Sequence, residues 1–399
     1  MRRGHPPVHD APRTALRSLP DRPDDHPATG GHTVLTSDLR LLITWGVPAR
    51  VAPVSLDNVR MAEHWKRKLD RLHADLVRRD DPAAWVTEAD AVDASSRYPH
   101  LALRGPVFGL AVQDPAAGEH WRLVKPVTGG TPQEARDELN SLLWFKAKDD
   151  TDDPATRRAL LAAVTRLEKK PLNEVTVLGV RYRVVRGDEF ARTGEHNLEP
   201  PRPTDPEPSL ISWDGRHEAR SPDTGFVLDP EQDGAGLMAG AMKLALSTFA
   251  YSGSRFPAVV RKHSERAVTT HPDIVLLPVG FGIAERAGQR WRPQSALMPT
   301  PHDARRLLYQ GMAEMWPLLY EFGERKRAVY AQAAEEFRRA RRADEARVDG
   351  RVFRICRIER MVRCGRDGPE QPRPSDLDDY GPMKMHPTMD EHGTLHDNG

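Results

Sequence analysis

The chain of 399 residues has only two cysteines, few aromatic side chains (6%) and no long apolar run. The cysteines, Cys356 and Cys364, are too few for a disulfide framework, and their counterparts in an internal repeat are Val185 and Thr193. A metal or redox role for the pair is therefore not expected. No run of about 18 apolar residues could form a membrane helix, and no secretory signal is visible. These absences predict a cytoplasmic protein with no membrane partner.

Net charge is almost absent as well, because 59 Lys and Arg residues balance 58 Asp and Glu residues to give +1. No overall field therefore steers the chain toward nucleic acid or membrane. The charge is nevertheless uneven: Arg255 to Arg366 carries 23 basic and 13 acidic residues, a local +10, which leaves −9 for the remainder. This asymmetry favours an anionic partner for the second half.

A duplication is the main positive feature of the sequence. Residues 179–205 align without a gap to residues 350–376 at an offset of 171, and ten of these 27 pairs are identical. Further matches lie upstream, where Phe108-Gly109 corresponds to Phe281-Gly282 and Trp121-Arg122 to Trp291-Arg292. A repeat of this length predicts two copies of one structural unit.

We predict an α+β fold made of two diverged tandem copies of a hairpin–two helices–strand unit in a pseudo-twofold arrangement. In the first unit, turn residues after Val112 indicate a hairpin, and Thr131-Pro132 and Asp153-Pro154 are typical helix starts. Residues 175–192 read as one final strand, and residues 324–347 of the second unit as one long helix. The predicted organisation is a disordered tail (1–36), an N-terminal strand and amphipathic helix (37–90), repeat unit 1 (91–208), a linker (209–256) with a buried helix (234–251), repeat unit 2 (264–379) and a C-terminal tail (380–399).

Motifs for catalysis or cofactor binding are missing from the sequence. It has no GxxxxGK[ST], HExxH, GxSxG or CxxC pattern, and we expect no cofactor and no metal. Gly234, Gly236 and Gly240 resemble a dinucleotide loop with one residue too many, so small residues on a buried helix explain them better. His386, His392 and His396 could ligate a metal, but their spacing matches no familiar site.

Two Trp-Arg pairs and two proline-flanked arginines recur in both units. A proline-flanked arginine lies on a stiff segment that could place its guanidinium on an indole ring. The favoured interpretation is that each tail folds back over its own sheet and covers its own Trp. The alternative is a pocket between the units that binds an anionic or peptide ligand. The candidate ligand-binding residues are Trp121, Arg122, Trp291, Arg292, Arg202 and Arg373.

Arginines also recur along the final strands and on the last helix. Strand alternation places Arg183 on the face opposite Tyr182 and Val184. A nucleic-acid surface would interleave such arginines with stacking aromatics, which are few here. A solvated face is therefore the favoured interpretation. The arginines are Arg181, Arg183, Arg351, Arg354, Arg357, Arg360 and Arg363 on the strands, and Arg338, Arg339, Arg341 and Arg342 on the helix.

Several segments together resemble an uncharacterised bacterial family, from high-GC Gram-positive bacteria, that is classed as a domain of unknown function. They include YPHLALRGPVFGLAV, ARDELNSLLWFKAKD, LGVRYRVVRGDEFARTG and PRPSDLDDYGPMKMHPTMDE. The resemblance covers residues 40–399. It implies a recurrent arrangement of these elements, and it implies no activity and no site residues.

Three functions stay open at this point. The favoured hypothesis is a non-enzymatic, cytoplasmic binding or scaffold protein, whose partner is an unknown protein or an anionic ligand. The second is nucleic-acid or anionic-ligand binding through the basic second half. The third is an enzyme with a site between the two repeat units.

Overall fold

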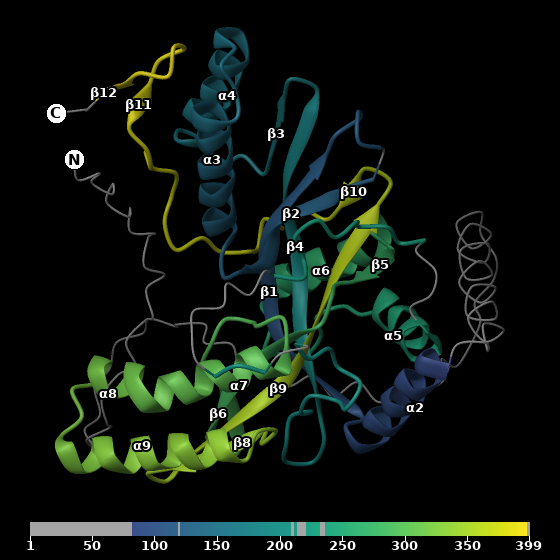
Figure 1. The fold of residues 1–399 in the computed structure, drawn as a ribbon. Helices are drawn as coiled ribbons and strands as arrows, with labels where there is room; N and C mark the ends of the chain where they lie inside the picture. Colours follow the sequence, from purple (N-terminus) through teal and green to yellow (C-terminus); the bar gives the residue numbers. More distant parts are fainter. Residues whose placement is uncertain (1–81, 119, 209–210, 214–220, 232–235, 397–399) are drawn as a thin grey trace, which may run out of the picture. The chain divides into compact units, whose positions relative to one another are not determined.

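A large antiparallel sheet organises the described part of the chain, which in this computed structural model is residues 82–118, 120–208, 211–213, 221–231 and 236–396. The strands along its main path follow the order β2-β1-β4-β9-β6-β7 (Figure 1). With the helices packed on this sheet, the fold is α+β, as predicted. The predicted tail 1–36, and the strand and amphipathic helix before residue 82, lie outside the described residues.

The first half of the fold follows the predicted order of elements. Thr131 caps α3 by accepting the Glu134 N–H, and Asp153 caps α4 in the same way at Ala155 and Thr156. Each helix has proline in its first turn, where a missing N–H leaves no hydrogen bond unmade. The elements are α2 (Pro82–Arg97), β1 (His100–Gln113), β2 (Arg122–Gly129), α3 (Pro132–Asp149), α4 (Pro154–Leu167), β3 (Glu174–Val177) and β4 (Val180–Thr193).

The second half has a similar order of elements after two additional helices. The predicted helix 324–347 is wrong beyond Arg339, because Arg341 has a left-handed backbone (φ 58°) and residues 345–348 pair with β9 as a strand. The elements are α5 (Leu237–Ser247), α6 (Ala258–Thr270), β5 (Asp273–Leu276), β6 (Gly280–Ala287), β7 (Arg290–Pro293), α7 (Pro301–Gln310), the π-helix η1 (Gly311–Met315), α8 (Trp316–Leu319), α9 (Glu324–Arg339), β8 (Glu345–Val348), β9 (Arg351–Gly365) and β10 (Gly368–Pro369).

Each half ends in a tight hairpin, whereas the sequence predicted a single strand over 175–192. Leu178 and Gly179 have positive φ angles of 51° and 82°, and Asp349 and Gly350 have 49° and 74°. Two consecutive residues with positive φ match a two-residue turn whose twist suits antiparallel strands. The turn therefore folds β3 onto β4 and β8 onto β9.

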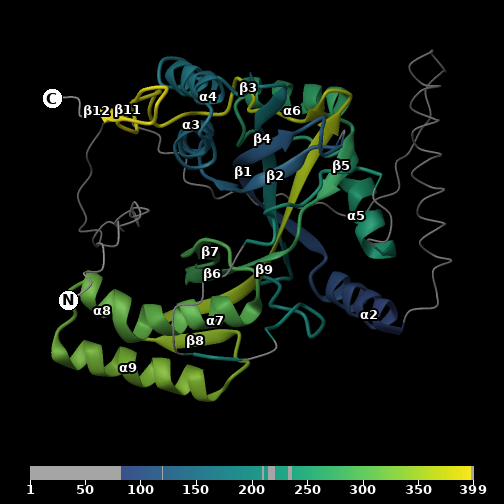
Figure 2. The ribbon, with the colours of Figure 1, turned by 45° about the horizontal axis from the view of Figure 1, so that its top comes forward.

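Three apolar clusters lie on one face of the sheet. Helices α3 and α4 cover Phe108 and Val184, whereas α7 and α9 cover Phe281 and Ile355. Figure 2 shows α3 and α4 near β1, and α7 and α9 near β6 and β8. Between them, α5 and the residues after it pack on Leu103, Phe190 and Met361. Of the residues in α5, only Met242, Leu246 and Ser247 are buried.

The opposite face of the sheet carries a fourth cluster, which we call the linker groove. Its floor is formed by Trp121, Leu123 and Val185, and Phe226 and Leu228 of the linker pack into it. The linker runs along β2: the Leu123 N–H donates to the Phe226 carbonyl at 2.9 Å, and the Leu228 N–H donates to the Trp121 carbonyl at 2.8 Å. The linker therefore extends the sheet locally by β-type pairing.

The two halves meet where β4 pairs with β9. Glu189 lies directly opposite Arg360, and the pairing continues over Gly187–Phe190. Directly opposed residues of an antiparallel pair project to the same face. Glu189 and Arg360 therefore project to the face that carries the linker groove, since Val362, two residues along β9, belongs to that cluster.

The tails that follow β4 and β9 each cross to the other half. The Arg186 N–H donates to the Glu370 carbonyl at 2.8 Å, and the Arg357 N–H donates to the Glu199 carbonyl at 2.9 Å. Further along, Asp378 accepts the Gln133 N–H at the start of α3 (2.6 Å). The expectation that each tail covers its own Trp is therefore wrong, because the tails exchange places.

Equivalent contacts tie the exchanged tails to helix starts in both halves. Glu207 accepts the His302 N–H at the start of α7 (2.9 Å) and also binds Arg305 (2.6 Å). A carboxylate at a helix N-terminus satisfies unpaired N–H groups and the helix dipole. The C-terminal residues end in a small hairpin of β11 (Thr388–Met389) and β12 (Leu395–His396). None of the helices described is both long and apolar enough to cross a membrane.

Candidate ligand-binding site

The two tryptophans predicted as site residues have different surroundings. Trp121 is buried beneath Gly368, where a Cβ atom would lie only 2.1 Å from the indole Nε1. Trp291 is half-buried, and its Nε1 donates to the His196 carbonyl at 3.1 Å. A strand arginine lies over each indole ring. The distance from Cζ to the ring centre is 4.5 Å for Arg183 over Trp121, and 5.6 Å for Arg354 over Trp291.

The proline-flanked tail arginines contact carboxylates. Arg202 Nε donates to Glu199 at 2.6 Å, and Arg373 donates to both oxygens of Glu370 at 2.7 and 3.0 Å. Charge-assisted hydrogen bonds of this kind are stronger than a partly exposed cation–π contact. The predicted stacking of these arginines on tryptophan is therefore wrong, and Arg373 lies over the ring of Tyr251, 5.7 Å from its centre.

Arg122 and Arg292 are exposed. Each follows its Trp in a strand, so alternation turns it to the other face. The structure therefore does not bring the six predicted residues together in one site. Of the six, only Trp291 lines the pocket found between the halves.

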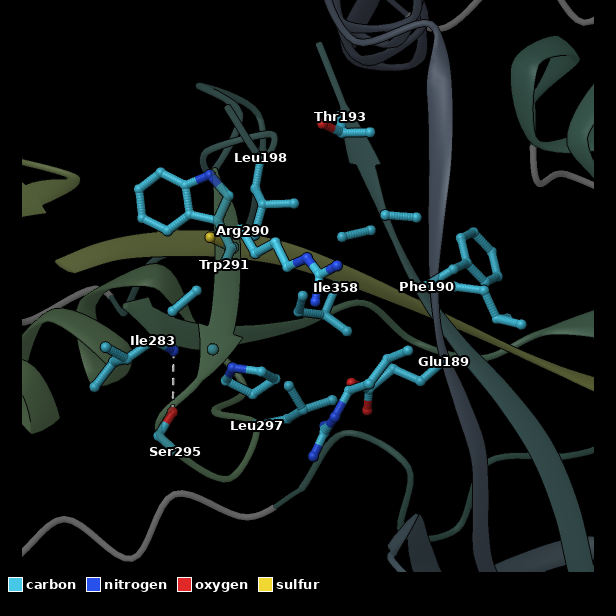
Figure 3. Close-up of a pocket in the computed structure, with 18 of the residues that line it drawn as sticks. Glu189, Phe190, Thr193, Leu198, Ile283, Arg290, Trp291, Ser295, Leu297 and Ile358 are labelled. Atoms are coloured by element: carbon cyan, nitrogen blue, oxygen red, sulfur yellow. Dashed lines mark hydrogen bonds and ion pairs between the residues drawn. The ribbon is translucent and has the colours of Figure 1, made fainter. Parts of the chain in front are cut away.

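This pocket has a volume of about 250 Å³ and lies on the same face as the linker groove. Strands β1 and β4 contribute walls from the first half, and β6, β7 and β9 contribute walls from the second. Figure 3 shows Trp291, Leu198 and Ile358 around it, with Arg290 extending from β7 between them. Further apolar lining comes from Ala102, Ala191, Ala284 and Leu297.

Strand alternation explains why these walls are apolar. Along β9, Phe353 and Ile355 project toward α7 and α9, so Cys356 and Ile358 project toward the pocket. The Cys356 thiol is buried and donates to the Arg354 carbonyl at 3.6 Å. Burial raises the pKa of this thiol well above its ordinary value. Cys356 is thus a neutral wall residue and no nucleophile.

The charged lining consists of three arginines, Arg104, Arg255 and Arg290, and one carboxylate, Glu189. Arg104 donates to one oxygen of Glu189 at 2.6 Å. The other oxygen, Oε2, is buried and has no hydrogen-bond partner. The excess of arginine favours an anionic ligand, and the unpaired oxygen favours a hydrogen-bond donor beside Glu189.

The Ser295 hydroxyl, the Cys356 thiol and the Glu189 carboxylate of the pocket lining each have a partner other than one another. The Ser295 hydroxyl accepts the Ile283 N–H at 3.0 Å and donates to the Ala296 carbonyl at 2.8 Å, so it has no adjacent base. Glu189 is held by Arg104, and Cys356 is neutral. Nucleophilic catalysis requires a nucleophile within hydrogen-bond reach of a base, and the lining offers no such pair.

The histidines weighed as metal ligands lie in different surroundings. His386 stacks on Trp144 at 4.6 Å and contacts the Ser141 hydroxyl at 2.9 Å, whereas His396 contacts Asp390 at 3.3 Å. No group of three or more potential metal ligands occurs in the part of the chain that the structure describes. These contacts account for the tail histidines as packing and hydrogen-bonding residues.

The glycines that resemble a dinucleotide loop lie at the start of α5 and within it, with Gly240 inside the helix. Gly234 lies outside the described residues, and Gly236 has a positive φ of 82° just before the helix. The Glu88 carboxylate accepts the Met238 N–H at 2.7 Å. A dinucleotide phosphate would need this helix start, which a carboxylate already occupies.

The interpretation of the strand arginines as a solvated face is wrong. Arg183, Arg360 and Arg363 are almost completely buried. Arg360 donates to both oxygens of Asp223, and Arg363 donates to main-chain carbonyls that include Leu246 and Phe249. Such partners satisfy most donors of a buried guanidinium, although Arg360 Nε has no partner, and burial leaves these side chains unable to form a nucleic-acid surface.

Sequence reasoning missed Arg104, Glu189, Arg290 and Ile358. One signal was present in the repeat, because the offset of 171 places Glu189 opposite Arg360 and inverts the charge at that position. Arg357 and Glu359, by contrast, keep the charges of their counterparts Arg186 and Asp188. A charge inversion within a repeat indicates that the two halves differ locally at this point.

The protein thus belongs to the α+β class, with a large antiparallel sheet and a pocket that residues of both halves line. Residues 81–379 match DUF5954, a family of unknown function, and the chain belongs to that family. No curated protein and no solved structure matches the chain.

Proposed function

We propose that this is a non-enzymatic, cytoplasmic binding protein, built from an internal duplication, whose ligand occupies the pocket between the halves. The observation that carries the proposal is the pocket itself, with apolar walls, a half-buried Trp291 and an excess of arginine over carboxylate. Concave sites with few, well-placed polar groups are typical of ligand binding. The ligand expected there combines an apolar body with an anionic group.

The duplication is supported by contacts that repeat at the sequence offset. Glu189 plus 171 is Arg360, and these two equivalent residues pair directly between β4 and β9. An antiparallel pair of equivalent residues lies on a local twofold axis. The exchanged tails obey the same relation, because Arg186 binds Asp376 at 3.0 Å and Arg357 binds Asp205 at 3.1 Å.

The buried strand arginines favour ligand binding over nucleic-acid binding. A nucleic-acid surface needs exposed cations along the backbone path. On α9, Arg338 and Arg339 share the Glu335 carboxylate, at 2.8 and 3.4 Å, so this cluster is internally paired. The buried arginines of β9 and the paired arginines of α9 are therefore used inside the fold.

Titration with the dye anilinonaphthalene sulfonate tests the proposal, because this dye joins an aromatic body to an anion. We expect saturable, one-to-one binding by the full chain. The variants Gly282→Val and Ala191→Leu each add bulk to the pocket wall and should abolish it. The control Leu318→Ala alters an exposed apolar side chain on α8 and should bind as wild type does.

Equal dye binding by wild type and both pocket variants would overturn the proposed site, and so would no saturable binding at all. Thermal unfolding of each variant checks that lost binding does not reflect lost structure. Native mass spectrometry of the protein isolated from its own cells then identifies a natural ligand by mass that is lost on denaturation.

A further inference from the structure

The pocket occupies the same position in the second half as the linker groove in the first. The repeat offsets relate Val185 to Cys356 and Gly109 to Gly282, and they relate Trp121 to Trp291. Trp121 and Val185 belong to the linker groove, and Gly109 lies on β1 between two residues of that cluster. Their three counterparts in the second half all line the pocket. The two sites are therefore equivalent surfaces, and one of them is filled by the chain itself.

The linker shows how such a surface is filled. Phe226 and Leu228, two residues apart, pack on the groove floor, while the Gly225 and Leu228 N–H groups donate to the Leu123 and Trp121 carbonyls at 2.8 Å each. Asp223 accepts the Val127 N–H at 3.1 Å and binds Arg360. An extended segment thus contributes main-chain pairing, two apolar side chains and one polar anchor.

The outer edge of β7 offers similar acceptors. The Gln294 N–H donates inward to the Ile283 carbonyl. Because main-chain groups alternate along a strand, the Trp291 and Pro293 carbonyls point toward the outer edge. No described residue donates a hydrogen bond to either carbonyl. Pro293 lacks the N–H that Leu123 supplies, so an added segment would donate two hydrogen bonds here and receive none at Pro293.

The pocket walls also leave more room than the groove walls. Ala102 and Ala191 stand where the first-half groove has Val275 and Val362. In the described part of the chain, no segment enters the pocket as Phe226 and Leu228 enter the linker groove. The space equivalent to those two side chains is the 250 Å³ cavity.

The charges around the pocket specify the segment further. In the pocket, Glu189 stands at the position that Arg360 has in the linker groove. A bound residue that corresponds to Asp223 would therefore meet a carboxylate with an unpaired oxygen. Arg104 already balances the charge of Glu189, and a neutral donor such as an amide therefore fits best. If the segment pairs antiparallel with β7, the segment residue that follows the second apolar side chain lies next to Arg290. The positive charge of Arg290 favours an acidic residue at that position of the segment.

We infer that the pocket binds an extended segment of a partner protein by adding it to the free edge of β7. The segment carries an amide side chain, two large apolar side chains two residues apart, and then an acidic residue. This mode of recognition combines main-chain hydrogen bonds for affinity with side-chain pockets for specificity. The inference rests on the proposed ligand-binding function and names the class of ligand.

A synthetic peptide tests this directly. It has the sequence of Ser221–Pro230 with Asp223→Asn and carries a fluorescent label, and its binding to the full chain is followed by anisotropy. We expect saturable binding that the Gly282→Val and Ala191→Leu variants abolish. The unmodified peptide with Asp223, and a peptide with Phe226→Ala and Leu228→Ala, should each bind about tenfold more weakly or worse.

Methylated peptides examine the main-chain pairing without altering the protein. N-methylation at the positions of Gly225 and Leu228 removes both donors and should weaken binding by about tenfold or more. N-methylation at Val227, whose N–H points away from the edge in the linker arrangement, is the matched control and should leave affinity nearly unchanged. Equal effects at all three positions would overturn edge pairing.

The remaining outcomes separate the inference from the proposed function. Dye binding without peptide binding would overturn the inference, and the pocket would then be a site for a small anionic molecule. Dimerisation of the full chain that Gly282→Val abolishes would replace the partner by a second copy. Failure of both dye and peptide would overturn the inference and the proposed function together.

Discussion

In the proposed duplication, the linker groove and the pocket are equivalent surfaces, of which the linker fills the first. In the groove, the Arg360–Asp223 pair is almost entirely buried, and both Asp223 oxygens and both terminal guanidinium nitrogens of Arg360 have hydrogen-bonding partners, whereas Arg360 Nε has none. In the pocket, the corresponding charge belongs to Glu189, and its partner Arg104 keeps 41% of its side chain exposed. Under the proposal, the filled site contributes to stability and the open site binds a ligand.

The two sites also differ in how closely the main chain approaches the wall glycines. A Cβ at Gly109 would lie 2.5 Å from the Pro126 carbonyl oxygen, whereas one at Gly282 would first meet Leu297 Cδ2 at 3.3 Å. The first contact is with rigid backbone and the second with the end of a flexible side chain. The groove is therefore packed to its limit, while the pocket still has space at the equivalent position.

The largest effect expected from this comparison is that of Asp223→Ala. Removing the carboxylate leaves the guanidinium of Arg360 buried without its charge partner, which should lower the free energy of unfolding by about 3–5 kcal/mol. Glu189→Ala breaks the equivalent pair in the pocket, but Arg104 can turn to water, so a loss within about 1 kcal/mol is expected. Urea denaturation of both variants measures the difference. Equal losses would show that the two pairs are equally buried in solution.

The next effect concerns the wall glycines. Gly109→Ala forces a methyl group into backbone and should cost about 1–3 kcal/mol. Gly282→Ala places the same methyl group against a side chain that can move, and a change below about 1 kcal/mol is expected. Thermal unfolding of the two variants compares them directly. A larger loss at Gly282 than at Gly109 would contradict the assignment of the filled and open sites.

Local chemistry made part of this fold predictable. Thr131 and Asp153 were recognisable as helix caps because a cap involves residues within three positions of one another. The repeat also predicts that Trp121 and Trp291 occupy corresponding positions, and this correspondence stays a prediction. Periodicity was weaker evidence, since it extended the last helix past Arg339 and missed the tight turn at Leu178-Gly179.

The candidate site could not be predicted in the same way, because its determinants are far apart in sequence. Asp223 lies 137 residues from Arg360, and nothing near either residue indicates the pair. The linker packs into the linker groove and leaves the pocket open, and its path depends on contacts between residues far apart in the sequence. Likewise, Arg357 looks like part of a solvated stripe until Asp205, in the tail from the other half, binds it at 3.1 Å.

The smallest effect distinguishes the two halves by pH. His271 packs against Gly365 as its counterpart Tyr98 packs against Gly194, with Cβ approaches of 3.0 and 3.5 Å. Burial lowers the pKa of His271 below its ordinary value; the nearby carboxylate of Glu370 opposes this shift, and the charges of Arg183, Arg373 and Arg363 act with it. The unfolded chain therefore takes up the proton more readily than the folded protein does.

The contribution of His271 to stability is accordingly complete above its ordinary pKa of about 6.5 and declines as the pH falls through that value toward the lower folded pKa. His271→Tyr installs the first-half residue, which does not titrate in this range. We expect the wild type to lose more unfolding free energy than this variant between pH 7.5 and 5.5, two values chosen to bracket the unfolded pKa. Urea denaturation at both pH values measures the loss, and all other titrating groups are common to the two proteins. Parallel losses would mean that His271 is solvated in the folded state, and that this corner of the second half is more open than its counterpart at Tyr98.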